Sequence, residues 1–134
     1  MSTRALGPFD VNVTPQAPND LPPDAALARH LLTKRYHGDL DAESTGEMLS
    51  VVTTVKGSAT YVAIERVNGI LHGRGGSFAL YHHGVMRRGV PSLTVTVVPD
   101  SGTGDLAGIA GTMAIEIDGK DHRYVLDYTL DAGH

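Results

Sequence analysis

From Gly57 to Met86 the chain is one long run of β-type composition, broken repeatedly by glycine, and a second glycine-rich stretch follows at Val97–Gly111. Strands favour β-branched and aromatic residues, and glycine permits the bulges and close bends of a curved sheet. An isolated Glu65 and the pair His82-His83 stand inside otherwise apolar segments of this run. The pattern predicts a curved β-sheet and singles out the few ionisable groups that it could carry toward a core.

Extended segments with short connections recur along most of the chain. Strands are expected over Leu6–Gln16, Leu31–Leu40, Glu47–Val55, Thr60–Leu71, Ser77–Met86, Ser92–Val98, Asp105–Ile117 and His122–Leu130. About eight strands at regular spacing are typical of a β-sandwich or an up-and-down β-barrel. An eight-stranded barrel is wide enough to be filled by its own side chains or to hold one small ligand.

Four local features complete this assignment. Ala17–Asp24 contains three prolines and is expected to be a loop. In Ala25–Leu32 the residues are helix-friendly, so a short helical turn competes there with a strand. Gly38 suggests a bulge or bend. Asn68-Gly69 is a hairpin signal, but too few residues follow before Gly73 for a new strand, so a continuous strand with a glycine bulge is favoured.

Size and charge limit the class of protein. The 134 residues fit a single domain spanning 1–134, and the net charge of −4 argues against nucleic acid or an anionic membrane as the main partner. The basic pairs Lys34-Arg35 and Arg87-Arg88 are expected to be solvated strand ends. The absence of cysteine excludes disulfides and thiolate metal sites. No secretory signal and no apolar run of about 20 residues is present, so a cytoplasmic location is expected.

Four longer segments resemble a known family. They are GDLDAESTGEML (Gly38–Leu49), YVAIERVNGILHGRGGSFALYHHGVM (Tyr61–Met86), VVPDSGTGDLAGIAG (Val97–Gly111) and HRYVLDYTL (His122–Leu130). Together they are similar to the bacterial domain-of-unknown-function family numbered 3224, from Phe9 onward except at Ala17–Asp24. The resemblance implies an all-β fold: a single antiparallel up-and-down barrel of about eight strands, like that of the plant allene oxide cyclases. Those enzymes bind an unstable fatty-acid epoxide and steer its ring closure. The resemblance is one of fold and assigns no cyclase catalytic residue to a position in this chain, and likeness of fold alone is a weak warrant for function.

Residues two apart in a strand share a face, and this predicts which side chains line the interior. The face with Tyr124, Leu126 and Tyr128 must point inward, because the opposite face carries Arg123, Asp127 and Thr129. Phe78, Leu80 and His82 form the better inward face of their strand. The strand Thr60–Leu71 has apolar residues and one charge on each face, and we place Tyr61, Ala63 and Glu65 inside. The residues expected to bind a ligand are Tyr61, Ala63, Phe78, Leu80, Tyr124, Leu126 and Tyr128.

The two candidate catalytic residues are Glu65 and His82. A buried carboxylate has a raised pKa unless a partner stabilises its charge, and His82 is a candidate partner, so that the two would form a general acid/base pair. The alternative is that Glu65 pairs with a surface arginine and that His82 is a hydrogen-bonded core histidine. A metal site would need His82 together with His122, and two ligands are too few, so no metal and no cofactor are expected.

Two functions remain open. In the first, the barrel binds a small apolar molecule in its interior and acts as an isomerase or cyclase by holding a flexible substrate in a reactive conformation. In the second, it is a non-catalytic structural or carrier barrel with a filled interior. Whether the protein is an enzyme is left open. The two apolar faces of Thr60–Leu71 suggest that its outer face is covered by another subunit, which predicts a homo-oligomer.

Overall fold

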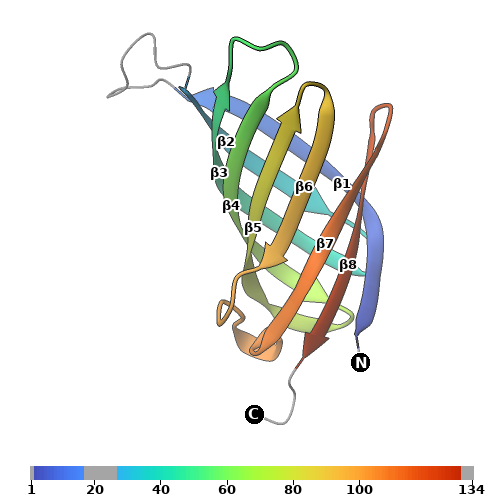
Figure 1. The fold of residues 1–134 in the computed structure, drawn as a ribbon. Helices are drawn as coiled ribbons and strands as arrows, with labels where there is room; N and C mark the ends of the chain where they lie inside the picture. The colour runs from blue at the N-terminus through green and yellow to red at the C-terminus, as the bar shows by residue number, and fades with distance from the viewer. Residues whose placement is uncertain (1, 17–26, 131–134) are drawn as a thin grey trace.

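The computed structural model describes residues 2–16 and 27–130, which form eight antiparallel strands and one short 3-10 helix (Figure 1). The strands are β1 (Thr3–Gln16), β2 (Leu27–Tyr36), β3 (Leu40–Val52), β4 (Ala59–Leu71), β5 (Arg74–Arg87), β6 (Val90–Val97), β7 (Ile109–Asp118) and β8 (Asp121–Leu130), and the helix η1 is Gly104–Leu106. No helix among these residues is long and apolar enough to cross a membrane.

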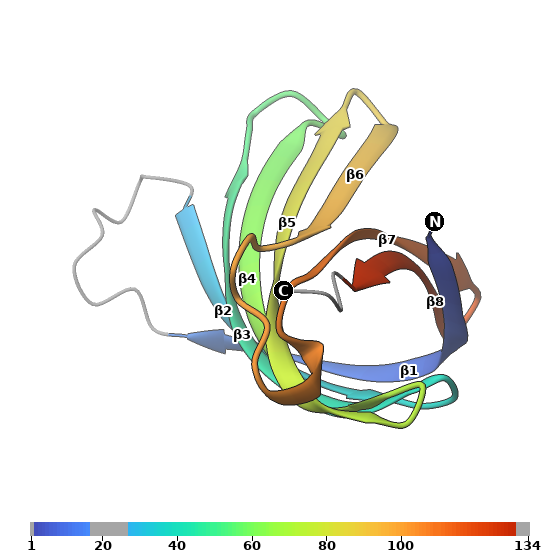
Figure 2. The ribbon, with the colours of Figure 1, turned by 90° about the horizontal axis from the view of Figure 1, so that it is seen from below.

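Each strand pairs with the next one in the chain, and β8 pairs back with β1, so the sheet closes into a barrel (Figure 2). The predicted all-β, up-and-down barrel of eight antiparallel strands is confirmed. The expected proline-rich loop at 17–24 lies outside the described residues.

Several local predictions need correction. The part of Ala25–Leu32 that is described belongs to β2 rather than to a helical turn, because its side chains alternate in burial and its backbone pairs with both β1 and β3. The segment Leu31–Leu40 is not one strand, because β2 ends at Tyr36 and Gly38, with φ of 90°, lies in the turn before β3, which is the bend expected at this glycine. Asp105 lies in η1, so β7 starts only at Ile109. The prediction of one continuous strand through Asn68-Gly69 is confirmed, since β4 continues to Leu71, but the expected glycine bulge is absent, because Gly69 pairs in unbroken register with both β3 and β5.

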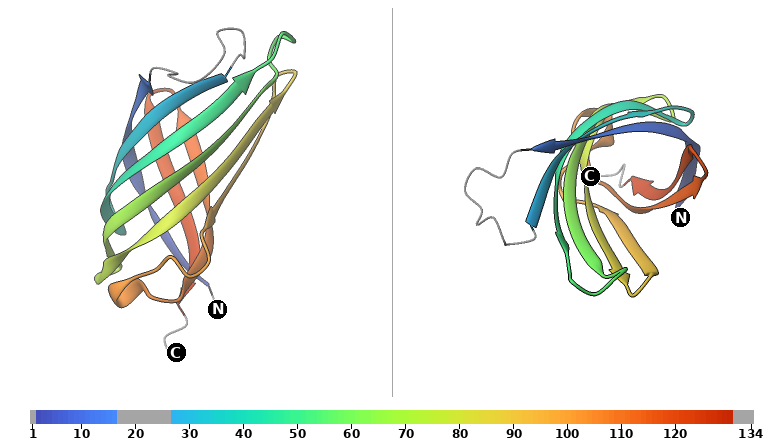
Figure 3. Two further views of the ribbon diagram at one scale, coloured as in Figure 1. Left: turned by 90° about the vertical axis from the view of Figure 1, so that its left-hand side faces the viewer. Right: turned by 90° about the horizontal axis from the view of Figure 1, so that it is seen from above.

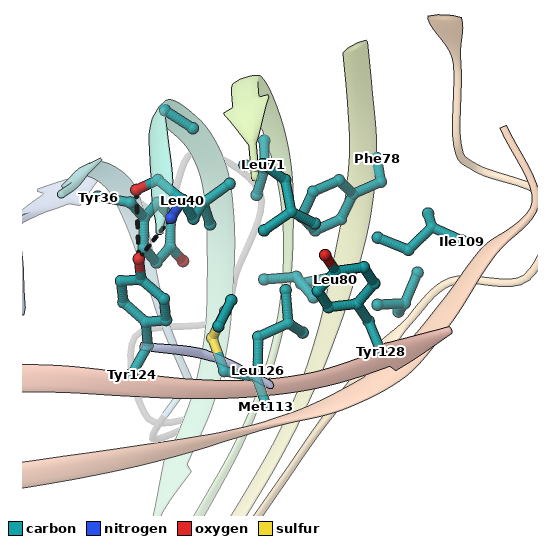
Figure 4. Close-up of a cluster of buried hydrophobic side chains, with 14 of the residues drawn as sticks. Tyr36, Leu40, Leu71, Phe78, Leu80, Ile109, Met113, Tyr124, Leu126 and Tyr128 are labelled. Atoms are coloured by element: carbon teal, nitrogen blue, oxygen red, sulfur yellow. Dashed lines mark hydrogen bonds between the residues drawn. The ribbon is translucent and has the colours of Figure 1, made fainter. Parts of the chain in front are cut away.

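One end of the barrel interior is filled, and we call it the packed half. It lies at the end where β2 turns into β3, β4 turns into β5, and the segment with η1 joins β6 to β7. Leu106 of η1 is 1% exposed and belongs to the core cluster. Figure 4 shows large side chains from several strands meeting there, with the hydroxyl of Tyr124 bonded to the backbone of Leu40. This half is a conventional hydrophobic core.

The other end, which we call the open half, lies toward the β3–β4, β5–β6 and β7–β8 hairpin tips. Strands β6 and β7 share only two residue pairs, Val95 with Met113 and Thr96 with Thr112, and they diverge beyond that junction toward their tips (Figures 2 and 3). Among the described residues, five large apolar side chains on the inner face remain 43–66% exposed in this half: Val13, Val52, Met86, Leu93 and Ile117. Their orientation follows from the register, since each pairs with an inward-facing residue, as Leu93 does with buried Gly84.

Candidate functional site

A charged side chain lies in the middle of the barrel, between the two halves. Glu65, in the centre of β4, points inward and is only 1% exposed. Gly46 of β3 lies directly across the sheet from it. A Cβ atom at Gly46 would overlap the carbonyl oxygen of Ile64 and would lie 2.7 Å from the Cα of Glu65. Glycine at this position therefore lets β3 and β4 approach closely around the carboxylate.

Three side chains hold the Glu65 carboxylate. The ammonium Nζ of Lys34 donates to Oε2 at 2.7 Å, and the imidazole Nε2 of His82 lies 2.7 Å from the same oxygen. The hydroxyl of Tyr36 donates to the other oxygen, Oε1. Lys34 is 9% exposed, His82 3% and Tyr36 0%. We call these four residues the carboxylate network.

The network keeps Glu65 ionised. Burial by itself raises the pKa of Glu65, but the hydrogen bond with His82 and the positive charge of Lys34 outweigh it and lower the pKa from 4.5 to about 2. Burial, followed by the nearby charge of Glu65, raises the pKa of Tyr36 well above 10. Tyr36 is therefore a neutral hydrogen-bond donor, and Glu65 is an anion across the physiological pH range.

The second ring nitrogen of His82 has a different environment. The described residues offer Nδ1 no hydrogen-bond partner, and it is not one of the two fully buried side-chain atoms that lack one, which are His30 Nδ1 and Ser44 Oγ. The side chain of His82 is 4% exposed, so a small part of the imidazole meets solvent-accessible space. When Nε2–H donates to the Glu65 carboxylate, Nδ1 of a neutral imidazole is an acceptor.

Tyr61 lies four residues before Glu65 on the inner face of β4, with Ala63 between them on the same face. It is partly exposed, and burial together with the charge of Glu65 raises its pKa. A Cβ atom at Gly84, its partner on β5, would overlap the aromatic ring. The ring of Tyr61 thus rests against the backbone of Gly84, at the boundary of the open half.

Replacing Gly84 by alanine is expected to push the Tyr61 ring off the barrel wall and to destabilise the protein by about 1–3 kcal/mol, as overpacking does elsewhere. The matched control is Gly75→Ala on the same strand, because a Cβ there meets nothing within 4 Å. Urea unfolding of both variants measures the difference. Equal stability of the two variants would show that the ring does not rest on Gly84.

The structure places the seven predicted ligand-binding residues on the inner face, in two groups. Phe78, Leu80, Tyr124, Leu126 and Tyr128 are at most 5% exposed and pack against one another in the core cluster (Figure 4). Tyr61 and Ala63 are nearer the open half, and Ala63 is 2% exposed. A ligand in the described structure would meet the first group only by displacing the core.

Both predicted catalytic residues face the interior and contact each other, although they are diagonal rather than direct partners, since His82 pairs with Ala63 and Glu65 with Leu80. Glu65 is paired within the barrel, with Lys34 and His82, rather than with a surface arginine. Arg66 points to the other face of β4 and donates to Ser77.

Sequence reasoning missed Lys34 and Tyr36. The pair Lys34-Arg35 is not a solvated strand end, because neighbouring strand residues point to opposite faces: Arg35 pairs with exposed Asp41 while Lys34 is buried. The signal was present in the alternation of Leu32, Lys34 and Tyr36, which places a lysine between two residues that belong in a core.

The described residues contain no group of three or more histidine, aspartate or glutamate side chains that could hold a metal ion. His82 bonds to Glu65, and the ring of His122 packs against Phe9 with centroids 5.3 Å apart. The two histidines have different neighbours.

Comparison with known proteins places the chain in a family. No curated protein matches it. A crystal structure at 1.84 Å of a protein with unknown function from the DUF3224 family of Shewanella oneidensis MR-1 is 46% identical to it, covers 98% of both chains and superimposes with a TM-score of 0.91. The family model described as "Protein of unknown function (DUF3224)" matches residues 5–128. The chain therefore belongs to the DUF3224 family.

Proposed function

We propose that the barrel binds a small, largely apolar molecule in its open half and that His82, held by Glu65, exchanges a proton with it, as an isomerase or cyclase would. The position of the carboxylate network supports the site. It borders the open half, where inward-facing apolar side chains remain exposed, and among the described residues Nδ1 of His82 has no hydrogen-bond partner. Pockets for small molecules are commonly apolar with a few such polar groups.

The observation that carries the proposal is the buried Lys34–Glu65–His82 cluster itself. Removing an ion pair from water costs several kcal/mol per ion, and a well-packed apolar replacement is often equally or more stable. Stability therefore gives no reason to keep a lysine and a glutamate at the centre of a barrel whose packed half is otherwise apolar. Buried charges with perturbed pKa values gather at functional sites.

The chemistry that this geometry supports is general acid/base catalysis. Ionised Glu65 accepts a hydrogen bond from Nε2–H and fixes the imidazole, which leaves Nδ1 to take a proton from a bound molecule or return one. Lys34 and Tyr36 hold the carboxylate in place and keep it charged. The apolar walls of the open half would fold a flexible molecule against Nδ1, which is catalysis by orientation.

The second candidate is a non-catalytic carrier or structural barrel. The close packing of Phe78, Leu80, Tyr124, Leu126 and Tyr128 favours it, because that half of the interior has no space for a ligand. In this case the carboxylate network is only a part of the core, and the open half is empty in the cell.

The test begins with native mass spectrometry of the purified protein, which is expected to release a bound small molecule. That molecule is then incubated with the protein in D2O. We expect deuterium at a carbon position with the wild type, and a rate about 100-fold or more lower with His82→Gln, since general acid/base groups contribute 10²–10⁴-fold.

The matched control is His83→Gln, because His83 is the next residue of β5 and is exposed on the outer face. It is expected to exchange at the wild-type rate. If the bound molecule exchanges deuterium at the same rate with both variants, the barrel binds it but His82 does not catalyse the exchange. Purified protein without any bound molecule would favour the filled, non-catalytic barrel.

A further inference from the structure

The outer face of the barrel carries an apolar hollow of about 940 Å³ over β2–β5. We call the face around it the outer patch. The residues that line it are Arg29, Leu31, Thr45, Gly46, Glu47, Leu49, Val62, Ala63, Ile64 and Tyr81. It lies on the opposite side of the sheet from the carboxylate network, since Ile64 points away from the interior that Glu65 faces.

The apolar side chains of the outer patch are contiguous and exposed. Leu49 is 55% exposed and pairs across the sheet with Val62 at 41%, while Ile64 at 60% pairs with Tyr81 at 42%. Single exposed apolar residues are ordinary on a soluble protein, but a continuous apolar patch marks an interaction surface. Water contact with these four side chains is unfavourable, and burying them against another surface would remove it.

We propose that the outer patch is the interface with a second copy of this chain, packed sheet against sheet. The charges of the outer patch suit such a partner. Among the described residues that line it, Arg29 and Glu47 alone are charged and pair at 2.8 Å, so this described face is neutral although the chain carries −4 overall. Two copies therefore meet here without the repulsion that their other surfaces would exert.

A second copy of the chain as the partner also fits the two-fold symmetry that is common in homo-oligomers. In a symmetric dimer the same patch meets itself, and each contact occurs twice. A patch with one arginine and one glutamate beside an apolar centre is self-complementary, because Arg29 of each copy can face Glu47 of the other. Packed sheets lie about 10 Å apart with interleaved side chains, so the side chains of one copy fill the hollow of the other. The interface does not depend on the proposed ligand site.

The test compares Ile64→Lys with Ile70→Lys by sedimentation equilibrium. Both residues lie on the outer face of β4, and Ile70 is 48% exposed but is not among the residues that line the outer patch. Wild type and Ile70→Lys are expected to be oligomeric at micromolar concentration. Ile64→Lys is expected to weaken association about 30-fold or more, which corresponds to the loss of a central interface residue. Circular dichroism checks that each variant is folded.

A second measurement uses the absence of cysteine from the chain. A thiol at Ile64→Cys is expected to react slowly with a thiol reagent in concentrated protein and faster on dilution, while Ile70→Cys reacts quickly at every concentration. A wild type that is monomeric at every concentration would overturn the proposal. So would protection of Ile64→Cys that does not change on dilution but is lost when a bound small molecule is removed. An oligomer that survives Ile64→Lys unweakened would place the interface elsewhere and overturn it too.

Discussion

Glu65→Gln is expected to lower the free energy of unfolding by about 3–5 kcal/mol, the usual cost of removing one partner from a buried ion pair. The amide keeps the shape of the side chain and can still accept from Tyr36, but it leaves the ammonium group of Lys34 buried without a counter-charge. Urea unfolding at neutral pH measures the loss.

The double variant Lys34→Met/Glu65→Gln separates charge from packing. Methionine replaces the lysine side chain, whose Nζ lies 5.2 Å from the ring centroid of Phe9 and 5.8 Å from that of Tyr36, and removes the unpaired charge. Most of the lost stability is therefore expected to return. Asp127→Asn is the exposed control, because it breaks the Arg4–Asp127 pair at the surface and exposed pairs contribute at most about 1 kcal/mol. Equal losses in Glu65→Gln and in the double variant would contradict the account of an uncompensated lysine charge.

The second large effect is a loss of stability in acid. The pKa of Glu65 is about 2 in the folded protein, against 4.5 for the unperturbed group. Above pH 4.5 the carboxylate is ionised in both states, and its full contribution, about 3 kcal/mol, is present. As the pH falls from 4.5 to 2 the unfolded chain takes up a proton that the folded protein does not, so this contribution declines and is gone below pH 2.

The measurement is the free energy of unfolding at several pH values between 2 and 7, for the wild type and for Lys34→Met/Glu65→Gln. Other carboxylates titrate in the same range, so only the difference between the two proteins isolates Glu65. We expect the wild type to lose about 3 kcal/mol more than the variant between pH 5 and pH 2. Parallel curves would mean that Glu65 has an ordinary pKa in the folded protein.

The fold was largely predictable, because its strongest signals are local. In the last strand, Tyr124, Leu126 and Tyr128 alternate with polar residues, and this alternation assigns the inner face without knowledge of any partner strand. The short distance from Asn68-Gly69 to the next turn favoured one long strand over a hairpin, and β4 has that form. The helix-friendly composition of Ala25–Leu32 left helix and strand open, and pairing with β1 and β3 decides for the strand over a weak local preference.

The candidate site was predictable only in part. Alternation placed Glu65 and His82 on inward faces, but it contains no information on which strands meet across a barrel. Lys34 comes from β2 and reaches Glu65 from a strand that is not its direct neighbour. The limited pairing of β6 with β7 leaves one half of the interior open. This is likewise a property of the tertiary structure that no local sequence pattern predicts.

The most direct test of the ligand site is an NMR titration of protein with ¹⁵N-labelled histidine, using the small molecule released from the purified protein. We predict that Nε2 of His82 carries a proton bonded to Glu65 throughout, and that the Nδ1 resonance of His82 shifts as the molecule binds while the resonances of His83 stay constant. An Nδ1 resonance of His82 that is unchanged at saturation would contradict the placement of the ligand above the carboxylate network.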